Sequence, residues 1–536
     1  MILRTLLLVF VPLLCYSLHC PAQWLYHELT SPLRHLPGPR NPSLLYGNTK
    51  EMLADFGLVS QWRTRFGRVF RFWGLFSISE IYISDLKALA HILNDNVAYR
   101  KPPFMLEKTR ISLGGGSVLD MELDDHKRHR RVLNQAFGPA QIRPLTDVFM
   151  DKAIQLRDIW AGRMEAEGDA TRIDISDGLR RATLDVIGQA GFHYQFNALE
   201  DKPNELNDTF TLLHHSSQSK LYDAVRMTQA KLPMLKLFPL PGAQFFRRGR
   251  AIMDSIGRTI VSDTKAALKK SENDENQGTR RDLLSVLLKA NLSNDLPSNQ
   301  RMSDTEIMAQ IRAFLFAGHE TTSSSVSWVL YELSVHPNMQ EKLREELFSL
   351  PTEAPTMDQL NSLKYLESVV RETLRLRAPV ISATRMAMRD DVLPLSKPYI
   401  DRRGNTHQEL LMPRGQVIHI PILAVNTDKE TWGADALEFK PDRWDALPDA
   451  VTSIPGVWAN LLTFYAGPHA CIGYRFSLVE MKALLFVLLR AFEFAPAVRE
   501  GGIVPQTHRV MQNPGLLVAD EKGEAFPLLV KPCRRN

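Results

Sequence analysis

The 536-residue chain has few cysteines, little excess charge and no common nucleotide-binding fingerprint. Its four cysteines, at positions 15, 20, 471 and 533, cannot build a disulfide framework, which favours a reducing compartment. The net charge of +5 is too small and too diffuse to predict binding to nucleic acid. Hydrophobic residues make up 44% of the chain, which is enough for a large buried core.

Two kinds of phosphate-binding loop are also absent. No Gly-x-Gly-x-x-Gly sequence occurs, so we expect no fused flavin or nicotinamide domain. The glycine run 113–117 lacks the Lys-Ser/Thr pair that completes a P-loop, and we predict a flexible loop there instead.

An apolar run from Thr5 to Leu18 predicts a membrane segment at the N-terminus. The run is short for a span of about 20 residues, and a cleaved secretory signal is the alternative. No small-x-small cleavage site follows, and Trp24 and Tyr26 are typical of a membrane interface. We therefore expect residues 1–32 to form an uncleaved anchor and linker, and residues 33–536 to form one large domain.

Hydrophobic periodicity predicts a mainly α fold with small β-sheets. The expected helices cover 51–66, 85–93, 124–137, 303–335, 362–377 and 474–492, and the expected short strands cover 69–73, 80–83 and 417–420.

The longest of these helices begins at a capping box, Ser303–Glu306, and ends before Pro337. Its 32 residues would span roughly 48 Å, enough to cross the whole domain. A polar hexapeptide, 317–322, lies in its middle. Either the polar groups are satisfied at a kink, or the helix opens there and admits dioxygen and water.

Cys471 lies in a turn-rich stretch, 464–473, directly before the last long helix. Free N–H groups and the helix dipole favour a negative charge at that place, so we predict a lowered pKa and a thiolate, the form that binds metal. A buried structural cysteine is the alternative.

The stretch resembles the heme-binding loop of the cytochrome P-450 family, Phe-x-x-Gly-x-Arg-x-Cys-x-Gly, through Phe464, Gly467, Cys471 and Gly473. The resemblance implies the cytochrome P-450 fold, a long central helix over the heme, and Cys471 as the thiolate ligand of the iron. The sequence departs from the pattern at His469, where the family has an Arg that pairs with a heme propionate. A neutral imidazole offers one hydrogen bond and little charge.

Three further motifs extend the resemblance. The hexapeptide resembles the oxygen-activation motif, which would make Thr321 the hydrogen-bond partner of dioxygen and Glu320 the proton relay. Glu372 and Arg375, with Arg443 in Pro-x-Arg-Trp, resemble a buried structural triad behind the heme. By sequence spacing alone, Glu372 and Arg375 would be an ordinary surface ion pair.

The basic helix 124–137 resembles the family helix that carries Trp-x-x-x-Arg. Arg130 would bind a heme propionate, as would Arg385, whereas His126 replaces the Trp. We interpret most of its charged residues as a solvated face that resembles the family's reductase-docking surface. His126 and His129 share a helical face, but no third metal ligand lies nearby in the sequence.

By the same resemblance, the substrate pocket would be lined by Phe314, Ala317, Val380 and Ile381, and the loop at 113–117 would lie over it. We expect residues 509–514 to form a hairpin tip that reaches towards the pocket. Residues 232–240, with Phe245 and Phe246, fit a membrane-dipping segment or a buried loop equally well.

These features predict a membrane-anchored heme-thiolate monooxygenase of fungal type. It would oxidise a lipophilic small molecule, such as a terpenoid secondary metabolite, with O2 and electrons from NADPH-cytochrome P-450 reductase. The domain would face the cytosol from a single-pass anchor in the endoplasmic reticulum. The alternatives are a heme-thiolate isomerase or dehydratase that uses no external O2, and a non-catalytic heme-binding membrane protein.

Overall fold

The structure is a computed structural model that describes residues 26, 28–54, 57–168, 170–200, 243–273, 281–292, 297, 300–499, 501–508, 511–517 and 526–533. Most of the expected anchor, the segment 232–240 and positions 509–510 of the expected hairpin tip lie outside these residues, as do the side chains of Phe245 and Phe246. Within the described ranges, no helix has both the length and the apolar character needed to cross a bilayer.

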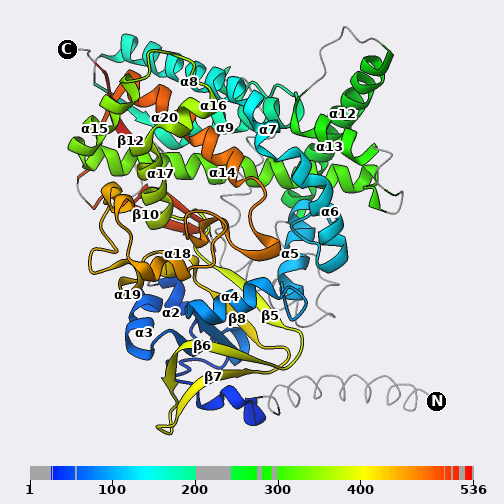
Figure 1. Ribbon diagram of the computed structural model, residues 1–536, viewed down its shortest axis with the longest axis vertical. Helices are drawn as coiled ribbons and strands as arrows, with labels where there is room; N and C mark the ends of the chain where they lie inside the picture. The colour runs from blue at the N-terminus through cyan, green and yellow to red at the C-terminus, as the bar shows by residue number, and fades with distance from the viewer. Residues whose placement is uncertain are drawn as a thin grey trace.

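Helices make up most of the described chain (Figure 1). Their bounds are α2 Thr49–Ala54, α3 Leu58–Phe66, α4 Leu86–Asn94, α5 Pro103–Leu113, α6 Leu123–Ala136, α7 Pro139–Ile142, α8 Thr146–Glu167, α9 Ile175–Phe192, α12 Ala243–Asn273, α13 Leu283–Leu292, α14 Asp304–Val335, α15 Pro337–Phe348, α16 Met357–Ser362, α17 Lys364–Leu376, α18 Ile422–Asn426, α19 Lys429–Trp432 and α20 Tyr474–Ala491.

The strands of the described residues form four small sheets. The largest has the order β1-β2-β8-β5-β3, in which only β2 and β8 run parallel. The others pair β4-β12-β9, β6-β7 and β10-β11, all antiparallel. The bounds are β1 Val69–Trp73, β2 Ser79–Ile83, β3 Tyr99–Arg100, β4 Thr171–Asp174, β5 Ala383–Ala387, β6 Asp391–Ile400, β7 Thr406–Met412, β8 Val417–Ile420, β9 Phe492–Pro496, β10 Ile503–His508, β11 Met511–Leu516 and β12 Pro527–Pro532. The predicted mainly helical fold with small sheets is confirmed.

The long helix α14 crosses the molecule and packs against α9, α12, α17 and α20 (Figure 1). Its start is the predicted capping box, because Ser303 Oγ accepts the N–H of Glu306 at 3.3 Å and Glu306 Oε2 accepts the N–H of Ser303 at 2.8 Å. Most of its side chains are buried, as a helix inside a core requires. The predicted helix 303–335 is therefore confirmed.

Two predicted helix boundaries are wrong. The expected helix 51–66 is divided into α2 and α3, with Gly57 at the N-cap of α3. The expected helix from residue 362 begins at Lys364, because Leu363 has extended dihedral angles and Ser362 ends the short helix α16. In both places the residues on either side continue a helical pattern, so periodicity alone does not reveal the interruption.

Candidate active site

The loop that precedes α20 holds Cys471 in a defined turn. Gly467 has a φ of +63°, and a Cβ atom there would lie 2.0 Å from the carbonyl oxygen of Leu93, so only glycine fits. The N–H of Cys471 donates to the carbonyl of Phe464 at 2.8 Å. Gly473 is the N-cap of α20. Phe464 and Gly473 thus shape the backbone around the cysteine.

The Cys471 residue is exposed, yet protein atoms lie close enough around its sulfur that desolvation raises the pKa of the thiol. The N–H of Gly473 and the charge of Arg130 act in the opposite direction but do not outweigh it. The predicted lowering of this pKa by the helix terminus is therefore wrong for the protein alone. A bound metal cation deprotonates a coordinating thiol by its own charge.

Two guanidinium groups lie near this loop, that of Arg130 partly buried and that of Arg385 buried. Arg130, from α6, donates to the carbonyl of Ala470 at 2.9 Å. Arg385, from β5, donates to the carbonyl of Thr384 at 3.0 Å, and its guanidinium carbon lies 4.9 Å from the ring centroid of Tyr465. Neither group forms an ion pair with a carboxylate of the described chain. Both positive charges are thus available to an anionic ligand.

The two departures from the P-450 pattern, at positions 126 and 469, lie against each other. The ring centroids of His126 and His469 are 4.1 Å apart. Burial lowers the pKa of both imidazoles, and that of His126 falls to about 3 with a further contribution from His469. At neutral pH this pair therefore contributes hydrogen-bonding groups rather than charge.

Lys101 and Glu122 complete the cluster, and the sequence pattern gave no signal for either. Glu122 Oε2 lies 3.5 Å from His469 Nε2, and Glu122 Oε1 lies 3.6 Å from Lys101 Nζ. Lys101 also donates to the carbonyl of Leu119 at 2.9 Å, and burial lowers the pKa of its ammonium group to about 8. We call Lys101, Glu122, His126, Arg130, Arg385 and His469 the cradle.

The chemistry of the cradle fits a heme. Its three cations and one carboxylate leave two positive charges, which match the two propionates of the cofactor. Within the described chain, both carboxylate oxygens of Glu122 and Nε2 of His469 are buried, and their contacts of 3.5 and 3.6 Å are longer than a normal hydrogen bond. Buried polar atoms in native proteins are normally paired, so these atoms indicate a place for a polar ligand or water. With Cys471 as the soft ligand, the set is suited to heme iron.

The interpretation of the basic helix as a solvated face needs a correction. His126 and His129 are fully buried, and Arg128 forms an ion pair with Glu306 of α14. Lys127 and Arg131 are exposed and fit the predicted face. No group of three metal-ligating His, Cys, Asp or Glu side chains is present in the part of the chain that the structure describes.

The polar hexapeptide lies in continuous helix within α14. The hydroxyl of Thr321 donates to the carbonyl of Ala317 at 2.8 Å, and that of Thr322 donates to the carbonyl of Gly318 at 3.2 Å. Thr183 of α9 donates to the carbonyl of His319 at 3.0 Å. The structure thus shows satisfied polar groups, without the local opening that the sequence also allowed.

Glu320 is contacted by an element nearly two hundred residues away. Asn513 Nδ2, in β11, lies 3.4 Å from Glu320 Oε1. The strand is fixed at this place because Ser324 Oγ donates to the carbonyl of Gln512 at 2.9 Å. Such contacts are often long in the absence of substrate and water. Asn513 is a site residue that the sequence did not reveal, although a hairpin near the pocket was expected.

The four residues predicted to line the pocket differ in exposure. Phe314 is buried, with its ring centroid 5.2 Å from that of Phe137, whereas Ala317, Val380 and Ile381 are partly exposed. Val380 forms a bridge with Met511, so the C-terminal hairpin, α14 and the segment after α17 meet at one place. Phe137 also approaches Gly473, which joins the cysteine loop to α14 through one aromatic ring.

The predicted triad is fully buried. Arg375 donates to Glu372 from Nε at 2.9 Å and from Nη2 at 2.7 Å, and Arg443 Nε donates to Glu372 at 3.3 Å. The indole N–H of Trp444 donates to the same carboxylate at 3.2 Å. The pair is therefore not the surface ion pair that its spacing also allowed.

Comparisons with known proteins agree with this geometry. The family model described as Cytochrome P450 matches residues 37–519. The chain is 44% identical over 513 residues to cytochrome P450 monooxygenase 205 of Postia placenta. The aligned region covers 94% of this chain and 93% of that protein. Cytochrome P450 monooxygenase claQ of Ampulloclitocybe clavipes is 35% identical over 516 residues, with 94% and 93% covered. A ganoderic acid synthetase of Ganoderma lucidum is 33% identical over 504 residues, with 88% and 90% covered.

Proposed function

Since the chain belongs to the cytochrome P450 family, and is a heme-thiolate monooxygenase like its relatives, we propose that it oxidises a terpenoid-type lipophilic small molecule in secondary metabolism. The similarity to a ganoderic acid synthetase supports this substrate class. The apolar side chains of Val380 and Ile381, partly exposed beside α14, suit a lipophilic molecule.

The observation that carries the oxidative function is the contact between Asn513 and Glu320 beside Thr321. Bound heme supplies a thiolate-ligated iron that activates dioxygen. The protein supplies the protons: Glu320 holds one at its carboxylate, and the hydroxyl of Thr321, which can both donate and accept, passes it on. Asn513 orients Glu320, and the apolar lining excludes water that would compete for the reaction.

Thr321→Ala tests this proton path, with Thr322→Ala as the neighbouring control. Substrates are first selected from terpenoids that shift the heme spectrum, and product and hydrogen peroxide are then measured per NADPH consumed. We expect Thr321→Ala to retain heme and substrate binding but to divert reducing equivalents to peroxide, because the hydroxyl that passes the proton is gone. Unchanged product per NADPH in Thr321→Ala would refute the assignment.

The electrons would come from NADPH-cytochrome P450 reductase on the endoplasmic reticulum, with residues 1–32 as the membrane anchor and the domain in the cytosol. The exposed cations Lys127 and Arg131, on the α6 helix that also carries Arg130, support a docking site for an acidic partner. Charge reversal at both positions should slow reduction by the reductase and leave reduction by dithionite unchanged. Equal slowing of both reactions would argue for damage to the heme site instead.

A further inference from the structure

The loop between α5 and α6, which contains three successive glycines, is ordered by its own side chains. Asp120 accepts hydrogen bonds from the N–H and the hydroxyl of Ser117, both at 2.8 Å, and from the N–H of Gly116 at 3.2 Å. Arg110 Nε donates to the same carboxylate at 3.1 Å. The flexible loop expected from the glycine run is therefore a compact turn in this structure.

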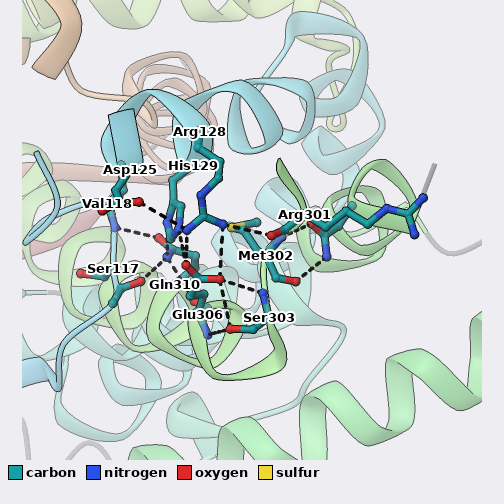
Figure 2. A network of polar contacts seen from close by, with 12 residues as sticks. Ser117, Val118, Asp125, Arg128, His129, Arg301, Met302, Ser303, Glu306 and Gln310 are labelled. Atoms are coloured by element: carbon teal, nitrogen blue, oxygen red, sulfur yellow. Dashed lines mark hydrogen bonds and ion pairs between the residues drawn. The ribbon is translucent and has the colours of Figure 1, made fainter. Parts of the chain in front are cut away.

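A single buried amide fixes this turn to α14. Gln310 donates from Nε2 to the carbonyl of Gly116 at 3.0 Å and accepts the N–H of Val118 at Oε1, also at 3.0 Å (Figure 2). Gln310 is only 1% exposed. The amide thus satisfies one backbone carbonyl and one backbone N–H of the loop, as the backbone of a paired strand would do.

The amide is itself held from behind. Gln310 Nε2 lies 3.1 Å from Nδ1 of His129, and Nε2 of His129 lies 3.1 Å from Glu306 Oε1 (Figure 2). Glu306 also forms the capping box of α14 and an ion pair with Arg128. Because Nδ1 must accept the amide proton, the arrangement needs the neutral Nε2–H tautomer of His129. Burial of this imidazole lowers its pKa and favours that form.

A second contact holds the other end of the glycine run. The buried Arg312 of α14 donates to the carbonyl of Leu113 and forms an ion pair with Asp254 of α12. Gly114 has a φ of +74°, and a Cβ atom there would lie 2.9 Å from Arg312 Nη2. Glycine at this position therefore lets the guanidinium approach the loop backbone.

The loop lies on the side of α14 that carries the oxygen-side residues. Gln310, Phe314, Ala317 and Thr321 follow one another at spacings of four, three and four residues, which places them along one face of the helix. At its far end, the loop joins the cradle through Lys101, which holds the carbonyl of Leu119. The loop thus spans from the oxygen side of α14 to the cysteine side of the site.

We propose that Gln310 is a positioning residue that clamps residues 113–120 as a fixed wall of the heme pocket and so restricts the size of the ligands that enter on this side. The inference rests on the heme site of the proposed function but not on the terpenoid substrate class. Gln310 would thus help to select ligands although it lies outside both the Cys471 loop and the hexapeptide.

The test compares Gln310→Ala and Gln310→Glu with the wild-type holoenzyme. Hydrogen exchange of residues 113–120 reports on the clamp, and stopped-flow spectra report the association of two azoles, imidazole and the much larger clotrimazole. In Gln310→Ala we expect loop exchange and clotrimazole association to become about tenfold faster, because two hydrogen bonds are lost. Association of imidazole should not change. Gln310→Glu, which keeps the acceptor for Val118 but not the donor for Gly116, should be intermediate.

Asp304→Asn is the matched control, because it removes an exposed ion pair with Lys265 at the start of the same helix and leaves Glu306, His129 and the loop unchanged. It should leave loop exchange and both association rates unchanged. Gly114→Ala crowds Arg312 from the loop side and should reproduce the Gln310→Ala effects even if that variant does not accumulate. The proposal is overturned if Gln310→Ala and Gly114→Ala both keep the wild-type rate of hydrogen exchange in the loop. It is also overturned if the association rates of imidazole and clotrimazole rise by the same factor. Absence of a thiolate-type heme spectrum in the wild type would instead refute the proposed function, since loop exchange can still be measured.

Discussion

Two charge clusters of this protein, each around a carboxylate with buried oxygens, differ in how many hydrogen bonds the protein gives that carboxylate. In the triad, the carboxylate of Glu372 accepts hydrogen bonds from Arg375, Arg443, Trp444 and the backbone of Lys440. In the cradle, Glu122 has only the long contacts with Lys101 and His469 and no hydrogen-bond partner in the described chain. The guanidinium groups of Arg130 and Arg385 form no ion pair with a carboxylate of that chain. The carboxylate oxygens are buried in both clusters, so their burial does not distinguish the two. We infer that the triad, whose carboxylate is fully hydrogen-bonded, stabilises the fold. The cradle, whose carboxylate is not, is suited to binding a ligand.

Removal of one triad member should have the largest effect on stability. Arg375→Ala leaves the buried carboxylate of Glu372 without its main partner, which should lower the free energy of unfolding by about 3–5 kcal/mol. Chemical denaturation of the holoenzyme measures the loss. Arg371→Ala on the same helix, which breaks the more exposed pair with Glu367, should cost under about 1 kcal/mol. Equal losses in the two variants would mean that the triad has no special structural role.

Removal of a cradle cation should affect the cofactor rather than the fold. Arg130→Met removes a charge-assisted hydrogen bond to a propionate, so heme should leave roughly 10- to 100-fold faster. Transfer of heme to excess apomyoglobin measures that rate. Lys127→Met, on the exposed face of the same helix, is the control and should release heme at the wild-type rate. If the two variants behave alike, the cradle does not hold the propionates through Arg130.

Glu480 of α20 sharpens the comparison, because its carboxyl is buried between α20 and α14 without a counter-charge. Burial raises the pKa of the carboxyl well above 4.5, and the hydroxyl of Thr322 on α14 lowers it only in part. Within the described residues no cation pairs with this carboxyl. Above about pH 4.5 the Glu480 carboxyl therefore loses its proton in the unfolded chain but keeps it in the folded protein. Wild-type stability should fall relative to Glu480→Gln as pH rises above about 4.5, by up to 1.4 kcal/mol per pH unit until the folded-state pKa is reached.

Urea denaturation of both proteins at pH 5, 6, 7 and 8 measures this difference, which should grow with pH and be smallest at pH 5. A difference that is independent of pH would mean that Glu480 is ionised in the fold, with a counter-charge. In that case, the lack of a counter-charge beside Glu480 would not mean that its carboxyl is protonated in the folded protein.

The smallest expected effect is that of His469→Arg. The arginine restores the family residue but meets Glu122 3.5 Å from the present Nε2, so part of its charge is neutralised within the protein. We expect heme release to slow by no more than about threefold, a change of under 1 kcal/mol. In the background of Glu122→Gln the same substitution should slow release further. An identical effect in both backgrounds would mean that Glu122 does not compete for this position.

Local signals predicted the fold well where one residue type decides the structure. Ser303 and Glu306 mark the start of α14, and Pro337 lies just beyond its end. The breaks at Gly57 and Leu363 were missed, because the residues around them continue a helical pattern and only the backbone shows the interruption.

Site residues that belong to a sequence motif were predictable, and site residues outside the motifs were not. Cys471, Thr321 and the triad lie in recognisable patterns, whereas Lys101, Glu122, Gln310 and Asn513 lie in none. Their roles depend on contacts between distant segments, as when Asn513 meets Glu320. The sequence also could not show that the departures at 126 and 469 are one feature, because only the fold brings the two imidazoles to 4.1 Å.

The most direct test of this account is the reduced carbon monoxide difference spectrum of the purified protein beside that of Cys471→Ala. The wild type should show the red-shifted Soret band of a thiolate-ligated heme, and the variant should lose it. A band at the position of histidine-ligated heme in the wild type, or an unchanged spectrum in Cys471→Ala, would contradict the assignment of Cys471 and of the cradle around it.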